Sequence, residues 1–219
     1  PGSGPVEFAA LLATIRAELK RWRQGPHADS AVQAAGKLER WRRRKRPATL
    51  VTSVGRLTEQ KVRLLCLPCS DGRSVLEHLL QRLGRRGLLL MLGSGDPTLE
   101  AFFSAICARA DNFVFLCGFS EPLSEQLYAG GDLFLMPSSF EPCGISQMLA
   151  MRAGQPCLVH AVGGLADTVR DEVNGFAFSG DNEAEQAQHL LQRFDQVLAL
   201  RADDPAAWQR VSREAAAAR

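Results

Sequence analysis

The spacing of hydrophobic residues along the chain changes character near residue 47. Between Val6 and Trp22, apolar side chains recur three and four positions apart, which is typical of an amphipathic helix. Gly25 and Pro26 end that helix, and a second helical stretch continues as far as a basic cluster before Pro47. The pattern therefore predicts a helical, basic amino-terminal segment or linker over residues 1–47.

From residue 48 onward, short apolar runs alternate with helical segments. Five of these runs are typical of buried strands, and they span residues 50–54, 88–92, 113–117, 133–136 and 157–160. Helical patterns lie between them at residues 73–83, 98–110, 121–130 and 146–153. This alternation predicts an α/β fold with a doubly wound, parallel, Rossmann-like sheet and right-handed crossovers.

Two further helical stretches follow this domain, at residues 183–202 and 205–218, without a clear strand of their own. We therefore expect a Rossmann-like domain over residues 48–180 and carboxyl-terminal helices over residues 181–219 that pack on it.

Composition places the chain among ordinary globular proteins. Of 219 residues, 46% are hydrophobic and 23% are charged, which argues against a disordered chain. The apolar run at residues 87–93 is far shorter than the roughly 20 residues that span a bilayer. No signal-peptide pattern is visible either, so we expect a soluble protein without a membrane partner.

Positive charge is concentrated near the amino terminus, although the net charge is only +2. The densest run covers residues 40–46, where six of seven side chains are Arg or Lys. Such a run is able to contact a nucleic acid through its phosphates, but a solvated helix end has the same composition. We favour the second interpretation, because few aromatic residues accompany the charges.

Six cysteines are present, and several lie in apolar stretches, as free buried thiols do. This favours a reducing compartment. Cys66 and Cys69 form a lone C-x-x-C without a second pair at zinc spacing, so metal or redox use is the weaker interpretation. The sequence predicts no metal ligands and no cofactor.

The loops after the first two predicted strands combine glycine with polar residues. Gly55 precedes Arg56 and Lys61, and two such cations are suited to grip a diphosphate, although surface cations are often only solvated. The second loop, at residues 92–97, contains G-x-G but lacks a third glycine and a P-loop lysine. Neither dinucleotide binding nor ATP hydrolysis is therefore supported.

The loops after the last two predicted strands are also rich in glycine. Residues 136–147 carry Glu141 and Gly144 before a helix whose free amides would face an anion or sugar hydroxyls. Gly163 and Gly164 form a pair that lets a backbone approach a ligand closely. Because the carboxyl ends of parallel strands share one edge, the four loops predict a composite phosphate-and-sugar site.

Four segments in this order resemble the carboxyl-terminal half of bacterial glycogen synthases and plant starch synthases. They are residues 56–61 (RLTEQK), 93–97 (GSGDP), 137–144 (PSSFEPCG) and 163–169 (GGLADTV). The resemblance covers about residues 50–180. It implies a GT-B glycosyltransferase, in which two Rossmann-like domains face a cleft and the carboxyl-terminal one holds the nucleotide sugar. Such enzymes transfer glucose from ADP-glucose or UDP-glucose to the non-reducing end of an α-1,4-glucan, with retention.

The resemblance also implies roles for individual residues. Arg56 and Lys61 would bind the diphosphate and stabilise charge on the leaving nucleotide without a metal ion, and Glu141 would lie beside the donor glucose. Phe119 would pack against adenine, although a core position is an alternative for it. The implied substrate contacts are Gly55, Phe119, Cys143, Gly144, Ile145, Ser146, Gly163, Gly164, Leu165, Asp167 and Thr168, the last two ordering the glycine loop.

The chain departs from the pattern of these enzymes at several points. Val62 replaces a glycine after the lysine, and Leu149 stands where related glycosyltransferases carry a second glutamate. The lysine-glycine loop and the histidine of the amino-terminal domain have no counterpart before residue 50. We therefore expect the donor-binding half of the enzyme, in the cytoplasm, or in the plastid stroma of a plant or alga. The alternative is a non-catalytic regulatory or binding module that retains the fold.

Overall fold

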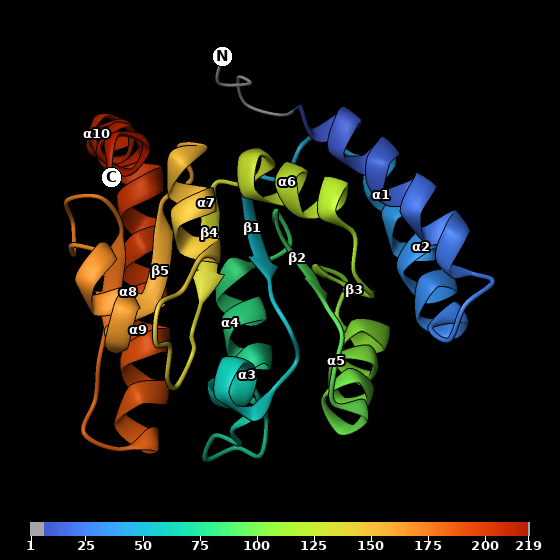
Figure 1. Ribbon diagram of the computed structural model, residues 1–219, viewed down its shortest axis with the longest axis horizontal. Coiled ribbons are helices and arrows are strands. Elements are labelled where there is room, and N and C mark those ends of the chain that lie inside the picture. The colour runs from blue at the N-terminus through green and yellow to red at the C-terminus, as the bar shows by residue number, and fades with distance from the viewer. Residues whose placement is uncertain (1–6, 219) are drawn as a thin grey trace.

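The computed structural model describes residues 7–218 (Figure 1). Val6, the expected start of the first helix, lies outside these residues. Within them, no helix combines the length and the apolar character needed to cross a bilayer.

The core of the molecule is a six-stranded parallel sheet with the strand order β3-β2-β1-β4-β5-β6. The strands are β1 (Thr49–Val54), β2 (Gly87–Gly93), β3 (Phe113–Cys117), β4 (Leu133–Met136), β5 (Cys157–His160) and β6 (Phe176–Phe178). The doubly wound parallel fold is therefore confirmed. The strand β6 was not predicted, because three residues after a glycine are too few to show a strand pattern.

Ten helices are present among the described residues. They are α1 (Phe8–Trp22), α2 (Ala28–Arg42), α3 (Glu59–Cys66), α4 (Val75–Leu83), α5 (Pro97–Arg109), α6 (Glu121–Gly130), α7 (Ser146–Arg152), α8 (Gly163–Thr168), α9 (Glu183–Asp203) and α10 (Pro205–Ala217). Several begin at side chains that accept backbone N–H groups: Ser74 forms a capping box with Glu77, and Asp96 caps α5 directly before Pro97. The short helices α3 and α8 follow the first and fourth glycine loops, where the sequence predicts the start of a helix without fixing its range.

Helices cover both faces of the sheet, because alternate residues of each strand point to opposite sides. Along β2, Leu89 and Met91 join the cluster under α3, α4, α5 and α9, whereas Leu88 and Leu90 pack against α1, α2 and α6. A third cluster lies under α7 and α8 beside β4 and β5. Every residue of β2 is buried, which explains why its sequence is a continuous apolar run.

The amino-terminal helices pack on the sheet beside β3 and α6 (Figure 1). Leu11, Ile15 and Leu38 are fully buried in a cluster that they share with the strands. The indole N–H of Trp41 donates to the carbonyl of Asp111 at 3.1 Å. This packing favours the helical interpretation of the segment over a linker, while the boundaries at residues 47 and 180 stay predictions.

One buried polar cluster connects the central strand to the neighbouring crossovers. The Thr52 hydroxyl donates to the Gln155 side-chain oxygen at 2.8 Å. The Gln155 amide donates to the carbonyls of Leu127 and Tyr128 at 2.9 and 2.7 Å. Each of these polar groups is therefore paired inside the core.

Candidate functional site

The loops after β1 and β2 lie side by side at the carboxyl edge of the sheet. The N–H of Leu57 donates to the carbonyl of Ser94 at 2.9 Å, and the N–H of Asp96 donates back to Leu57 at 2.9 Å. A Cβ atom at Gly93 would lie 2.2 Å from the carbonyl oxygen of Gly55. The G-x-G segment is therefore required for contact between two loops, which its sequence pattern did not predict.

Lys61 lies in the first turn of α3, the helix that follows the loop after β1. Thr58 caps this helix, and its side chain accepts the N–H of Lys61 at 3.3 Å. The neighbouring Val62 is buried in the main core, and Lys61 is partly exposed. The helix therefore has one face in the core while the ammonium group of Lys61 lies at the carboxyl edge.

Glu141 forms an ion pair with Lys61, although the two residues are 80 positions apart. The carboxylate is held in the β4–α7 loop, and its side chain is only 7% exposed. The Ser138 hydroxyl donates to the same carboxylate oxygen at 3.3 Å. A nearly buried carboxylate is thus neutralised by one cation and oriented by one hydroxyl.

Two hydrogen bonds fix the loop of Glu141 against α3. The backbone N–H of Ser139 donates to the carbonyl of Gln60 at 2.8 Å, and the side-chain amide of Gln60 donates to the carbonyl of Phe140 at 3.0 Å. Lys61 and Glu141 therefore belong to segments that are hydrogen-bonded to each other directly beside the ion pair.

A buried histidine is hydrogen-bonded to the same loop. His160 lies at the end of β5, stacks on Phe178 with ring centroids 5.0 Å apart, and directs Nδ1 at the carbonyl of Ser138 at 3.0 Å. Burial lowers its pKa, so the ring is neutral at neutral pH and Nδ1–H is the donor. This role of His160 was not predicted, because one histidine in an apolar strand forms no recognisable sequence pattern.

The glycine pair, Gly163 and Gly164, packs closely against the loop that carries Glu141. A Cβ at Gly163 would lie 2.1 Å from the carbonyl oxygen of Glu141, and one at Gly164 would lie 2.2 Å from that of Cys143. The N–H of Gly164 donates to the Glu141 carbonyl at 2.8 Å. Gly163 also has φ near 47°, where other residues are strained. The pair therefore decides where the loop of Glu141 lies.

The start of α7 presents backbone amides next to Glu141. Gly144 has φ near 66°, and Ile145 precedes the helix without a side-chain cap. Tyr128 donates its hydroxyl to Ser146 at 3.2 Å. The arrangement is suited to hydrogen bonding with an anion or with sugar hydroxyls, as the glycine pattern predicted.

Gln147 links the two loops and was not singled out from the sequence. Its amide nitrogen donates to the carbonyl of Gly144 at 2.8 Å and to the Thr168 hydroxyl at 3.1 Å. Thr168 in turn donates to the carbonyl of Gly164 at 2.7 Å. These bonds hold the glycine loop against the start of α7.

The remaining predicted site residues differ in exposure. Gly55, Arg56, Cys143 and Asp167 are all exposed. Phe119 is 77% exposed, so the alternative core position for this ring is wrong. Leu165 was expected among the substrate contacts, but its side chain is buried in the cluster under α8 and its N–H donates to Val162 at 3.0 Å. Because of this burial, Leu165 supports the loop and its side chain does not face a ligand.

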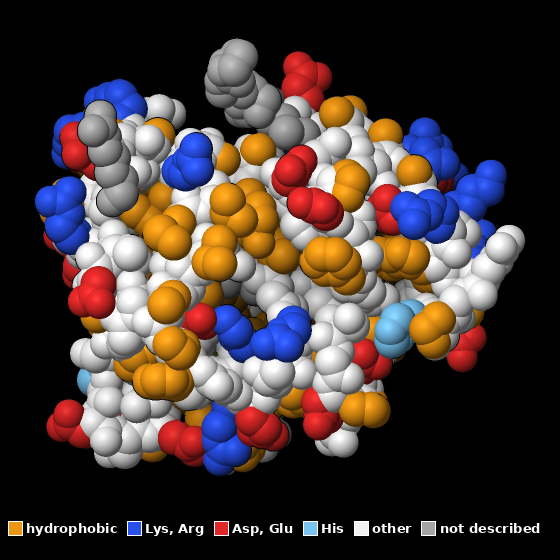
Figure 2. Space-filling model, in the orientation of Figure 1, with side chains coloured by type: hydrophobic (Ala, Val, Ile, Leu, Met, Phe, Trp, Pro, Cys, Tyr) orange, Lys and Arg blue, Asp and Glu red, His pale blue; other side chains and the backbone are white. Residues whose placement is uncertain are grey.

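The space-filling view shows how these groups are distributed on one face. Lys and Arg side chains lie near the middle of the face beside a hollow, and hydrophobic side chains surround them (Figure 2). The exposed apolar side chains at this edge are Phe119, Phe140, Ile145, Met148 and Leu149.

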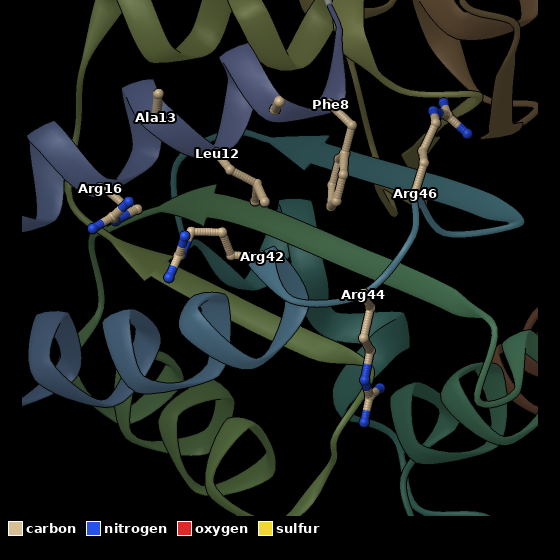
Figure 3. A pocket seen from close by; sticks show the side chains of 8 residues that line it. Phe8, Leu12, Ala13, Arg16, Arg42, Arg44 and Arg46 are labelled. Atoms are coloured by element: carbon tan, nitrogen blue, oxygen red, sulfur yellow. The ribbon is translucent and has the colours of Figure 1, made fainter.

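The basic run lies elsewhere, before β1 and beside α1. A hollow of about 410 Å³ is lined there by Phe8 and Leu12 together with four arginines (Figure 3). Arg42 pairs with Glu39 at 2.6 Å, and Arg46 pairs with Asp132 at 3.0 Å. Internal partners therefore take up much of this charge, which supports the interpretation as a solvated helix end.

Comparison with known proteins identifies the family. The sequence matches the family described as "Glycosyl transferases group 1" over residues 48–196. The chain belongs to this family. It is 42% identical over 173 residues to a glycogen synthase of Geobacillus thermodenitrificans, and 40% identical over 162 residues to one of Deinococcus radiodurans. These alignments cover 76% and 74% of the chain but only 33% of each relative, so the chain spans about a third of their length.

Solved structures of other proteins have the same fold. The catalytic domain of starch synthase IV from Arabidopsis thaliana, bound to ADP and acarbose, superimposes with a TM-score of 0.62 at 26% identity. That match covers 96% of this chain and 39% of the other. An Anabaena protein in complex with UDP-glucose gives a TM-score of 0.60 at 18% identity, covering 92% and 47% of the two chains, which shows the fold alone. The molecule is the carboxyl-terminal domain of a GT-B glycosyltransferase similar to glycogen and starch synthases.

Proposed function

We propose that this domain binds the nucleotide-sugar donor of a retaining glucosyltransferase. The enzyme transfers glucose from ADP-glucose or UDP-glucose to the non-reducing end of an α-1,4-glucan. The observation that carries the proposal is the ion pair between Lys61 and Glu141, surrounded by free helix-start amides at the carboxyl edge of a doubly wound sheet. Its similarity to glycogen synthases and to a starch synthase bound to ADP supports the same assignment.

Donor binding rearranges the charges of this pair. The diphosphate is a stronger partner for Lys61 than a single carboxylate, because it offers more charge and more acceptor oxygens. Arg56 adds a second cation from the open side of the site, and the two stabilise charge on the leaving nucleotide. Glu141 is then released toward the donor glucose, while Ser138 keeps its orientation.

The other contacts follow from exposure and loop geometry. Phe119 offers its exposed ring as a stacking surface for the base. The amides near Gly144 and Ile145 are placed to bind phosphate or sugar oxygens, and Ser146 lies in the same turn. Gly163, Gly164 and the Asp167–Thr168 pair shape the loop that faces the sugar.

The complete reaction also requires an acceptor site. The proposed partner is an amino-terminal GT-B domain, which brings the glucan end to the donor when the two domains close. This chain alone therefore binds nucleotide and transfers little glucose. We place the protein in the cytoplasm, or in the plastid stroma if it comes from a plant or alga.

A calorimetric titration of ADP, with UDP as the comparison, tests the donor site in this chain. Lys61→Ala removes a charge-assisted contact worth about 1.5 to 3 kcal/mol, so ADP affinity falls roughly 10- to 150-fold. Arg63→Ala is the matched control, because Arg63 lies on the same helix but pairs with Glu59 and Glu183. Equal affinities for these two variants would contradict the proposal.

A second variant separates donor binding from catalysis. Glu141→Gln removes the internal partner of Lys61, so the chain binds ADP at least as tightly as the wild type. Joined to its amino-terminal domain, the same variant should lose glucose transfer. Weaker ADP binding by Glu141→Gln would show that the carboxylate does not compete with the diphosphate.

The alternative function is a non-catalytic regulatory or binding module that retains the fold. The observation that favours it is Val62, which stands where the related enzymes carry a glycine after the lysine and is buried in the main core. Such a module would show no saturable ADP or UDP binding, and joining it to an amino-terminal domain would not produce transfer.

A further inference from the structure

We propose that His27, Glu100 and Cys117 form a binding site for one divalent cation of the zinc class. The three residues come from different elements: His27 directly precedes α2, Glu100 lies in the first turn of α5, and Cys117 ends β3. Their nitrogen, oxygen and sulfur atoms all lie within 4.8 Å of one another. The proposal does not depend on the proposed donor site.

The two spacings from the His27 ring match those around a tetrahedral zinc ion. His27 Nδ1 lies 3.3 Å from Cys117 Sγ and 3.6 Å from a carboxylate oxygen of Glu100. Around zinc, with bonds of about 2.0 to 2.3 Å, neighbouring ligand atoms of a tetrahedron are roughly 3.3 to 3.8 Å apart. The ligand atoms of Glu100 and Cys117 lie within 4.8 Å of each other, and an ion bound by both draws these two side chains together.

The chemistry of the ligands selects the class of cation. Imidazole nitrogen and thiolate sulfur favour zinc and similar borderline metals over magnesium or calcium, which prefer oxygen. A thiolate and a carboxylate together balance the two positive charges of the ion. Three protein ligands leave a fourth position for water or for a nearby oxygen.

A neighbouring hollow gives a cation access to the cluster and contains oxygen atoms that are able to act as a fourth ligand. The cluster opens into a hollow of about 310 Å³ that Asp29 and Ser104 also line. The side chains of His27 and Glu100 are 28% and 19% exposed, whereas Cys117 is buried at the bottom. A cation therefore reaches the thiol through the two polar ligands.

The position of the cluster suggests what the ion does. It lies where the turn between α1 and α2 meets α5 and the end of β3. The next residue, Gly118, packs against Trp22 so closely that a Cβ would lie 3.0 Å from the indole ring. Metal binding would fasten the amino-terminal helices to the sheet edge, two residues before the exposed ring of Phe119.

Cobalt titration of the full chain tests this site, because a thiolate–cobalt bond gives a charge-transfer absorption band. We expect one ion per chain, displaced by zinc. Cys117→Ser should abolish the band, and His27→Gln and Glu100→Gln should weaken cobalt binding at least tenfold. Since the last two positions are partly exposed, these variants are expected to fold even if Cys117→Ser does not; circular dichroism checks this.

The control is the double variant Cys66→Ser/Cys69→Ser, which removes the two thiols of the C-x-x-C segment and should leave the band unchanged. Absence of a band in the wild type, its persistence in Cys117→Ser, or its loss in the double variant would each overturn the proposal. Lys61→Ala should bind cobalt like the wild type, so the metal site and the donor site are tested separately.

Discussion

Replacing Gly164 by alanine tests whether contact between two loops determines the position of Glu141. The new Cβ would lie 2.2 Å from the carbonyl oxygen of Cys143, whereas real Cβ contacts are essentially never closer than 3.0 Å. The loops must therefore separate by most of an ångström, which also strains the 2.8 Å hydrogen bond from Gly164 to Glu141. Overpacking together with this weakened bond costs about 2 to 3 kcal/mol.

For a domain of this size, that loss of stability lowers the melting temperature by roughly 4 to 12 °C. Scanning calorimetry measures it, and ADP titration should show weaker binding because the loop of Glu141 and Cys143 has moved. Gly36→Ala is the matched control: Gly36 lies within α2, and its Cβ would meet no atom within 4 Å. Alanine there should stabilise the protein by about 0.5 to 1 kcal/mol. A Gly164→Ala protein with unchanged melting temperature and ADP affinity would refute the reasoning.

Three other predictions concern the core, a buried histidine and an exposed thiol. Gln155→Leu leaves the Tyr128 carbonyl without its donor and removes the acceptor of Thr52, so urea unfolding should show a loss of about 3 kcal/mol; a loss below 1 kcal/mol would contradict this. Because burial lowers the pKa of His160 in the folded state, unfolding binds protons, and stability should fall as the pH drops below about 6.5. The His160→Asn variant, followed by thermal unfolding between pH 5 and 7, should lose part of that slope, and an identical slope would show that other groups cause it. Cys143 is exposed, so a maleimide should label it before the other cysteines, and ADP should slow this labelling. Mass spectrometry of the peptides measures both, and faster labelling of another cysteine or an unchanged rate with ADP would contradict the prediction.

The regular part of the fold was predictable from the sequence, because it depends on local patterns. Residues 113–117 and 133–136 are apolar throughout and lie between helical patterns, and the structure has strands with these same bounds. The ranges of α3 and α8 were not predicted, since these helices have only eight and six residues, too few for a helical period to be recognised. The strand β6 is too short for any periodic pattern to appear.

The candidate site was predictable in its composition but not in its internal contacts. Arg56, Lys61 and Glu141 stand in recognisable motifs at the ends of predicted strands, so sequence alone assigned them to one edge. That Lys61 pairs with Glu141, and that Gln147 joins two loops, depends on segments about 20 to 80 residues apart in the chain. A local sequence pattern does not indicate which of these distant segments are in contact.

The sequence by itself determined the family, the parallel sheet and the edge where the glycine loops gather. Motif order and hydrophobic periodicity are properties of the sequence and can be recognised before any contact is known. Tertiary structure alone decided that the glycine pair seats one loop on another, that Leu165 is buried while Phe119 is exposed, and that His27, Glu100 and Cys117 meet. The physical reason is that close packing and ligand geometry depend on distances between elements, and these are set only when both faces of the sheet are covered.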